Sequence, residues 1–119
     1  MDKVNLGQKF KLFDEYWTPK ITGELNGQYV KLVKVRGEFF WHKHDNEDEL
    51  FLVIKGSLTI KLRERDIQLD EGEFYIVPQG IEHKPLAEKE AHLLMFEPKS
   101  TKHTGDVKSE LTVEKQEWI

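Results

Sequence analysis

Short apolar segments that alternate with polar residues run through most of this 119-residue chain, and Gly or Pro residues punctuate them. Residues 29–35 place their side chains alternately on two faces. Similar segments follow at residues 50–54, 57–63, 67–69, 74–77 and 92–96. Alternation with a period of two indicates β-strands, and short strands at regular spacing are typical of an all-β sandwich or barrel. We therefore predict about eight or nine short strands, with no helical crossover long enough for a parallel βαβ unit.

Turn residues divide the predicted strands. Asn26-Gly27 lies between two alternating segments, which is the strongest short signal for a two-residue hairpin. Further turns are predicted at Lys55-Gly56, at residues 64–66, at residues 70–72 and at residues 78–80.

The N-terminal residues have a different period. Leu6, Phe10, Phe13 and Trp17 recur at spacings of four, three and four, which predicts a short amphipathic helix or arm lying over an apolar surface. Thr18-Pro19 follows and would end such a helix.

The length of the chain allows one domain with a single core. We predict that residues 1–119 form this domain, with a core barrel at about residues 20–98 and a polar C-terminal arm at about residues 99–119. The arm would lie on the surface or against a partner subunit. His103 falls within it, and we expect its side chain to be exposed.

Charge and composition exclude several classes of function. The net charge of −4 and the isoelectric point of about 5.7 leave no basic surface for nucleic acid, and they disfavour binding to anionic membranes. No apolar run approaches the roughly 20 residues that cross a bilayer, and the N-terminus lacks a signal-like apolar stretch, so we expect a cytoplasmic protein. The chain has no cysteine, so any metal would be held by His, Asp or Glu.

The stretch HKHDNEDE, residues 42–49, interrupts two strand-like segments. His42 and His44 lie two residues apart at the end of a strand, so both side chains leave one face, with Cα atoms about 6.6 Å apart. Glu49 begins the next strand, and His83 follows the Pro78-Gln79-Gly80 turn. These four residues are candidate ligands of one metal ion.

Simpler interpretations exist for parts of this stretch. Charged runs between apolar segments are usually solvated loops, and Asp45, Glu47 and Asp48 fit that description. Asp48 replaces Glu49 as a candidate ligand if the strand begins one residue earlier.

The glycine, histidine and proline pattern resembles that of the cupin superfamily, whose members are small double-stranded β-helix barrels of the jelly-roll kind. The resemblance is carried by two motifs in order, Gly37-x4-His42-x-His44-x4-Glu49-x6-Gly56 and Gly72-x5-Pro78-x-Gly80-x2-His83. Two positions depart from the usual pattern. Four residues rather than five separate Gly37 from His42, and Ala87 stands where the family often has Asn.

The resemblance implies that His42, His44, Glu49 and His83 bind a divalent metal ion. Three imidazoles and a carboxylate suit Fe, Mn, Ni, Co or Zn, and the identity of the ion stays open. Phe40, Phe51 and Val53 fall in phase with His44 or Glu49 and are candidates for the pocket wall, although such residues are usually core. His92 is a further candidate, as a packed residue or one that supports the ligands.

Two functions are compatible with such a site. The first is a metal-dependent enzyme that oxygenates or isomerises a small oxygenated substrate, such as a hydroxy acid, keto acid, sugar or diketone. The second is a non-catalytic module that binds or senses a metal and a small ligand. The resemblance also implies a homodimer, for which Phe10, Phe13 and Trp17 could supply the apolar contact.

Overall fold

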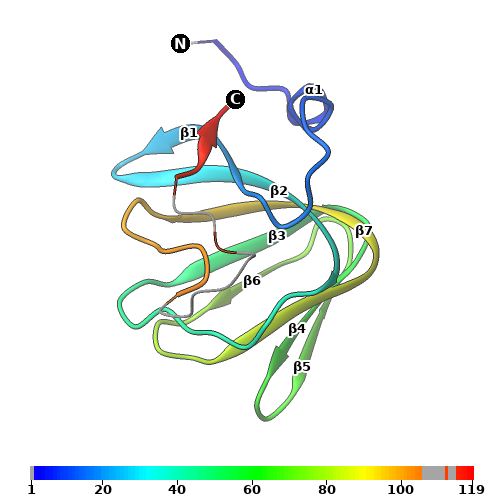
Figure 1. The fold of residues 1–119 in the computed structure, drawn as a ribbon, viewed down its shortest axis with the longest axis vertical. Coiled ribbons are helices and arrows are strands. Elements are labelled where there is room, and N and C mark those ends of the chain that lie inside the picture. Colours follow the sequence, from blue (N-terminus) through cyan, green and yellow to red (C-terminus); the bar gives the residue numbers. More distant parts are fainter. Residues whose placement is uncertain (1, 106–111, 113–114) are drawn as a thin grey trace.

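The computed structural model describes residues 2–105, 112 and 115–119, and its strands roll into a barrel (Figure 1). One short helix, α1 (Leu6–Phe10), comes first. The strands in chain order are β1 (Lys20–Leu25), β2 (Gln28–Glu38), β3 (Glu49–Lys55), β4 (Leu58–Leu62), β5 (Asp66–Leu69), β6 (Phe74–Val77), β7 (His83–Pro98) and β8 (Glu117–Trp118). The predicted all-β barrel with a short N-terminal helix is therefore confirmed.

Strand β7 holds the barrel together. It pairs with β2 on one side, and on the other it pairs first with β4 and then with β3. The sequence predicts a strand only at residues 92–96, and it predicts none through the charged residues 88–90. Those residues are exposed, but the strand continues through them and alternates between buried and less buried positions on both sides.

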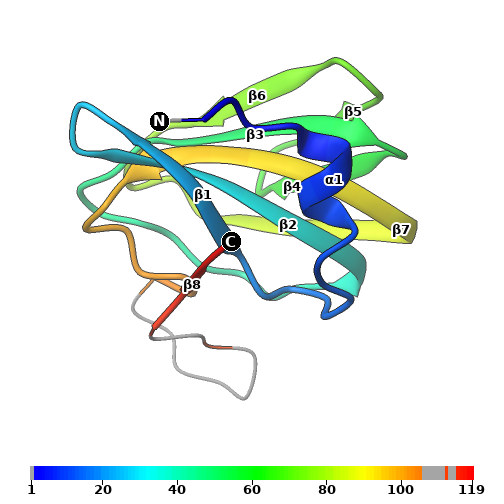
Figure 2. The ribbon, with the colours of Figure 1, turned by 90° about the horizontal axis from the view of Figure 1, so that it is seen from above.

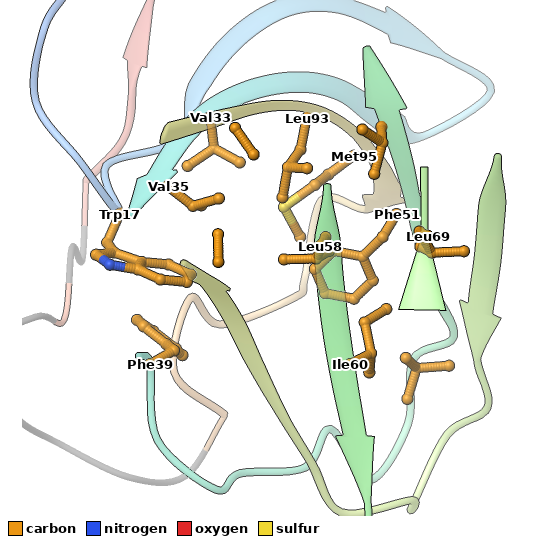
Figure 3. Close-up of a cluster of buried hydrophobic side chains, with 14 residues drawn as sticks. Trp17, Val33, Val35, Phe39, Phe51, Leu58, Ile60, Leu69, Leu93 and Met95 are labelled. Carbon is orange, nitrogen blue, oxygen red and sulfur yellow. The ribbon is translucent and has the colours of Figure 1, made fainter. Parts of the chain in front are cut away.

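The core lies inside the rolled sheet, and its side chains alternate along each strand as predicted (Figure 3). Every second residue of the central strands points inward. The inward residues include Val33 and Val35 of β2, Phe51 and Val53 of β3, Leu58 and Ile60 of β4, and Leu93 and Met95 of β7. Burying each of these side chains contributes about 1.5–3 kcal/mol, so the inner face stabilises the barrel.

The Asn-Gly hairpin is confirmed. Asn26 and Gly27 join β1 to β2 with φ angles of 50° and 78°. Positive φ at both central residues is what a type I′ turn requires, and its twist matches that of the two strands.

The N-terminal helix is shorter than its apolar period suggests. Helix α1 ends at Phe10, residues 11–12 form a turn, and Tyr16 then bridges to Lys34 of β2. Phe10 and Phe13 are each only 5% exposed and pack against β2, while Trp17 closes one end of the core. Of the residues that the structure describes, none forms a helix long and apolar enough to cross a membrane.

The burial of these aromatic side chains corrects one expectation. Phe10, Phe13 and Trp17 are used inside their own chain, so they do not offer the apolar surface that we expected for a contact with a second copy. The physical reason is that the outer face of β2 and the end of the core would themselves be exposed without them.

The last described residues return to the barrel. Strand β8 pairs in parallel with β1, next to which the C-terminus lies in Figure 2, and the Trp118 ring meets the Tyr29 ring edge-on at 5.6 Å. Within residues 101–105, Thr101 and Thr104 are buried.

Gly56 occupies a turn that only glycine fits without strain. Its φ is +86°, and a Cβ atom there would lie 3.0 Å from the Glu90 carbonyl oxygen and 3.2 Å from the Cα of Ala91. Gly23 in β1 has open space around it and no positive φ.

We predict that Gly56→Ala lowers the free energy of unfolding by about 2 kcal/mol, because it combines left-handed strain with a tight backbone contact. Gly23→Ala is the matched control, and we expect its effect to stay within about 1 kcal/mol. Urea unfolding of both variants measures the difference. Equal effects would show that the turn tolerates a side chain.

Candidate metal centre

The candidate site forms where two distant segments run side by side. Residues 39–44, which follow β2, lie antiparallel to residues 80–85, and His42 and His83 exchange both backbone hydrogen bonds at 3.0 and 2.9 Å. The Gly80 N–H also donates to the His44 carbonyl at 2.7 Å. These bonds fix three histidine backbones relative to one another, and Glu49 enters from the first position of β3.

Four side chains converge at this point. His42, His44, Glu49 and His83 each offer one ligand atom, and these atoms all lie within 4.8 Å of one another. All four side chains are buried, with exposures of 5% or less. The ring centroid of His42 lies 5.1 Å from that of His44 and 4.3 Å from that of His83.

Backbone carbonyls orient two of the imidazoles. The Nδ1 of His42 lies 2.9 Å from the Phe40 carbonyl oxygen, and the Nδ1 of His83 lies 3.0 Å from that of Ile81. A ring nitrogen that faces a carbonyl oxygen must carry the hydrogen, so the Nε2 of each neutral ring is left as a lone-pair donor. This is the tautomer in which histidine binds a metal through Nε2.

Glu49 faces ring nitrogens at close range. Its Oε1 lies 3.3 Å from His83 Nε2 and 3.4 Å from His44 Nε2. If His83 is neutral, two lone pairs face each other, which is unfavourable unless a proton or a cation lies between them. Neither ring nitrogen of the buried His44 has a hydrogen-bond partner among the described residues. The donor set and its unpartnered nitrogens therefore fit a bound divalent cation.

The charges at the site follow from burial and contact. Burial, and then the neighbouring His83, lower the pKa of His42 to about 4. Burial also lowers the pKa of His44, but the adjacent Glu49 outweighs it and raises this pKa above its usual value. Burial would raise the pKa of Glu49, but contacts with Glu97, His44 and His83 hold it well below the usual range, so Glu49 is ionised.

A buried contact between Lys31 and Glu97 lies behind Glu49. Lys31 Nζ is 2.7 Å from Glu97 Oε1, and both side chains are almost fully buried. Burial and the charge of Glu49 raise the pKa of Glu97 well above its usual value, although Lys31 opposes this. Sequence analysis did not single out this pair. A signal was present, because Lys31 is in phase with the inward-facing Val33 and Val35 of β2.

A small apolar cavity of about 30 Å³ adjoins the cluster. Its polar residues include His42 and Glu49 of the cluster and His103. The apolar part of its wall consists of Trp17, Pro19, Val33, Val35, Phe39, Phe51, Pro85, Leu93 and Met95. Figure 3 shows Trp17, Val35 and Phe39 gathered at one end of the core, away from Leu69 and Ile60.

The four residues that we expected in the pocket wall lie in different parts of the structure. Phe51 lines the cavity. Val53 is fully buried in the core, and Phe40 stacks on Phe39 beside the core without lining the cavity. The inward residue is Phe39, because the chain leaves regular strand geometry after Glu38 and the strand alternation cannot be extended to residue 40.

His92 lies on the outer face of β7 and not in the cavity, because Ala91 and Leu93 take the inward positions. Its ring stacks on Phe10 at 4.6 Å, and its Nε2 contacts Glu90 at 2.7 Å. It therefore ties the N-terminal segment to the barrel and is remote from the ligands.

Two other expectations are resolved by the loop contacts. Asp48 is exposed and accepts a hydrogen bond from the Gln79 N–H at 2.8 Å, so it supports the loop and does not join the cluster. His103 is partly buried against Phe39, so the expectation that it is exposed was wrong. No local pattern in the sequence indicates this contact, because it depends on how residues 101–105 fold back.

The cupin domain family profile matches residues 29–106, which is more than half of the chain. The chain therefore belongs to the cupin family. A solved structure, a cupin-2 domain-containing protein from Shewanella frigidimarina, is 45% identical and superposes with a TM-score of 0.80, over 81% of this chain and 94% of that one.

Two curated relatives are also similar. The uncharacterized protein YdbB of Bacillus subtilis is 34% identical over 51% of this chain and 55% of its own length. The 3-hydroxyanthranilate 3,4-dioxygenase 2 of Aspergillus fumigatus is 30% identical over 62% of this chain and 42% of its own length. The chain thus spans about half the length of these relatives.

The buried histidines make stability depend on pH. His42 titrates near pH 4 in the folded chain and near 6.5 when unfolded, so below pH 6.5 the unfolded state binds more protons. His44 acts in a different window, since its raised pKa adds stability that is lost as pH rises above 6.5.

We predict that the metal-free protein loses roughly 1.5 kcal/mol of unfolding free energy from His42 alone between pH 6.5 and pH 5. Urea unfolding in the presence of a chelator, at pH intervals of half a unit, measures this slope. A flat profile over that range would contradict a buried neutral His42.

Proposed function

We propose that this cupin binds a divalent metal ion through His42, His44, Glu49 and His83. The observation that carries the proposal is the convergence of three imidazoles and an ionised carboxylate on one buried point, within 4.8 Å of one another. Such a set of three nitrogens and one oxygen suits Fe, Mn, Ni, Co or Zn. Four protein ligands leave one or two positions open on a five- or six-coordinate ion, which a small ligand can take.

We further propose that the protein is a metal-dependent enzyme that oxygenates a small oxygenated substrate, such as a hydroxy acid, keto acid, sugar or diketone. The named dioxygenase relative supports oxygenation. A bound divalent ion would supply Lewis acidity toward substrate oxygens and, with a redox-active metal, a route for reaction with dioxygen.

The residues of the chain would perform the remaining tasks. Glu49 contributes one negative charge, so a divalent ion would leave the site at about +1, which favours an anionic or chelating oxygen ligand. The wall that includes Phe39, Phe51 and Met95 excludes water and packs against the carbon skeleton. The Phe40 and Ile81 carbonyls hold two imidazoles in the tautomer that binds a metal.

Isomerisation is the less favoured reaction. It needs a separate general base, and His92 is not placed to act as one, because it lies on the outer face of β7 outside the cavity. A non-catalytic binding or sensing module uses the same four ligands and differs only in lacking turnover. The homodimer and the cytoplasmic location also remain proposals.

We predict that His42→Ala and Glu49→Gln reduce the metal content from about one ion per chain to background, because each removes a ligand from a set of four. Elemental analysis of protein purified without a histidine tag measures this. His92→Gln is the matched control, since it alters a histidine of the same barrel outside the cluster. Unchanged metal in both ligand variants would refute the site.

We predict that the Fe(II)-loaded protein consumes oxygen with at least one member of a panel of hydroxy acids, keto acids, diketones and sugars, and that Glu49→Gln abolishes this. An oxygen electrode, with product analysis by mass spectrometry, measures turnover. Stoichiometric metal binding without turnover across the panel would favour the binding module.

A further inference from the structure

The outer face of the sheet carries two rows of apolar side chains that run across β6, β3, β7 and β2. The strand register aligns one outward residue from each strand in the first row: Ile76, Leu50, Phe96 and Val30. It aligns a second row in the same strand order: Phe74, Leu52, Leu94 and Leu32. Because successive residues of a strand face opposite sides, both rows point away from the core.

The N-terminal segment covers one end of the second row. Phe10 and Phe13 pack there, and Leu32 beneath them is 0% exposed. At the other end Phe74 and Ile76 are 59% and 45% exposed, and the residues beside them are only half-buried. We name the uncovered part the outer apolar patch, which consists of Phe74, Ile76, Leu50, Leu52, Phe96 and Val30.

The outer apolar patch has the composition of an interface centre. Charged residues make up 34% of the chain, yet none occupies an outward position in either row. Among the large apolar side chains that are exposed in the described part of the chain, Phe74 and Ile76 are the two that share one face of one strand. A contiguous exposed apolar surface of this kind marks a site of interaction.

The absence of charge from the patch favours a second copy of this chain as the occupant. A two-fold interface brings the same surface to both sides, so a charged side chain near the axis would meet its own copy. Like charges in such contact are unfavourable, and the two neutral rows avoid this cost. Sheet faces also pack on one another at about 10 Å when their side chains interdigitate.

The size of the patch fits the centre of such an interface. Strands spaced about 4.8 Å apart, with outward residues about 6.7 Å apart along each strand, give the patch roughly 250 Å² of sheet surface. A standard interface buries about 800 Å² on each partner, with an apolar centre inside a polar rim. The patch supplies about a third of that area, and polar neighbours would supply the rest.

We propose that the outer apolar patch is the surface through which two copies of this chain pair, face to face about a two-fold axis. The patch takes the place of the N-terminal aromatic side chains as the contact surface of the proposed homodimer. The pairing does not depend on a bound metal ion. Because Leu50 and Leu52 alternate with Glu49 and Phe51 along β3, it would also support from outside the strand that carries one candidate ligand.

The first test places charge on the patch. Light scattering after size-exclusion chromatography, at roughly 1–100 µM protein, should give the wild type a mass of twice 14.1 kDa. The double variant Phe74→Glu, Ile76→Glu should raise the dimer dissociation constant at least roughly a hundredfold, because symmetry buries each new carboxylate twice. Both side chains are exposed in the single chain, so the far-UV circular dichroism spectrum should stay that of the wild type.

Leu12→Glu is the matched control. Leu12 is 63% exposed but lies in the turn after α1 and not on the strands that carry the patch. The same charge there should leave the dimer intact. A dimer that survives in the double variant overturns the proposal, and so does equal dissociation in Leu12→Glu. A monomeric wild type overturns it too, whether or not the patch then binds neutral lipid vesicles or another protein.

A cross-linking test stays decisive if the double variant fails to fold. The chain has no cysteine, so Ile76→Cys and Leu12→Cys each introduce one unambiguous thiol. A short flexible bismaleimide should join two chains through Cys at position 76 far more efficiently than through Cys at position 12. Equal yields at the two positions overturn the assignment of the surface.

Removal of metal separates this inference from the proposed function. Wild type treated with a chelator should remain a dimer, because the patch lies on the outer face of β3 and the candidate ligands lie inside. Dissociation on chelation overturns the proposal. A dimer that contains no metal before chelation supports the patch and refutes the metal site, so the two failures are distinguishable.

Discussion

The pair of backbone hydrogen bonds between His42 and His83 is the constraint on which the site depends. It joins two segments that lie far apart in the chain, and it does so outside the regular strands. Because both residues are bonded through their backbones, their side chains leave the same small area of the inner surface. Their rings are then turned by carbonyls two residues earlier in the chain, so the positions and tautomers of both imidazoles are set by the backbone.

Burial of Glu49 has an energetic cost that its surroundings offset. An ionised carboxylate inside a protein is unfavourable unless it is paired or hydrogen-bonded. The imidazoles approach it on one side, and the Lys31–Glu97 pair lies behind it. We interpret the effect of Lys31 and Glu97 chiefly as control of the charge of Glu49, since the contact with Glu97 lowers the pKa of Glu49. The site is in this sense organised before any cation arrives.

Much of the fold could be predicted from the sequence, because the period-two pattern and the Asn26-Gly27 turn are local signals. The four clustered residues could be proposed as ligands from their spacing together with the resemblance to the cupin motifs, although neither can show that they converge. Phe39 was missed because a strand period was carried past the end of β2, and His103 because its position depends on a fold-back of the chain. Both errors concern segments without regular structure, where neither propensity nor period carries information.

The late position of β7 in the chain affects how the barrel folds. This strand is the shared partner of β2, β3 and β4, and it lies after all three of them in the chain. During synthesis the earlier strands therefore emerge from the ribosome without the neighbour that seals them, and their apolar inner faces stay open until residue 98 has been made. Contacts between such distant residues also slow folding, because the entropy cost of closing the loops comes before strand pairing can stabilise the barrel. Barrel closure is thus a late event, and the pocket can be completed only after it.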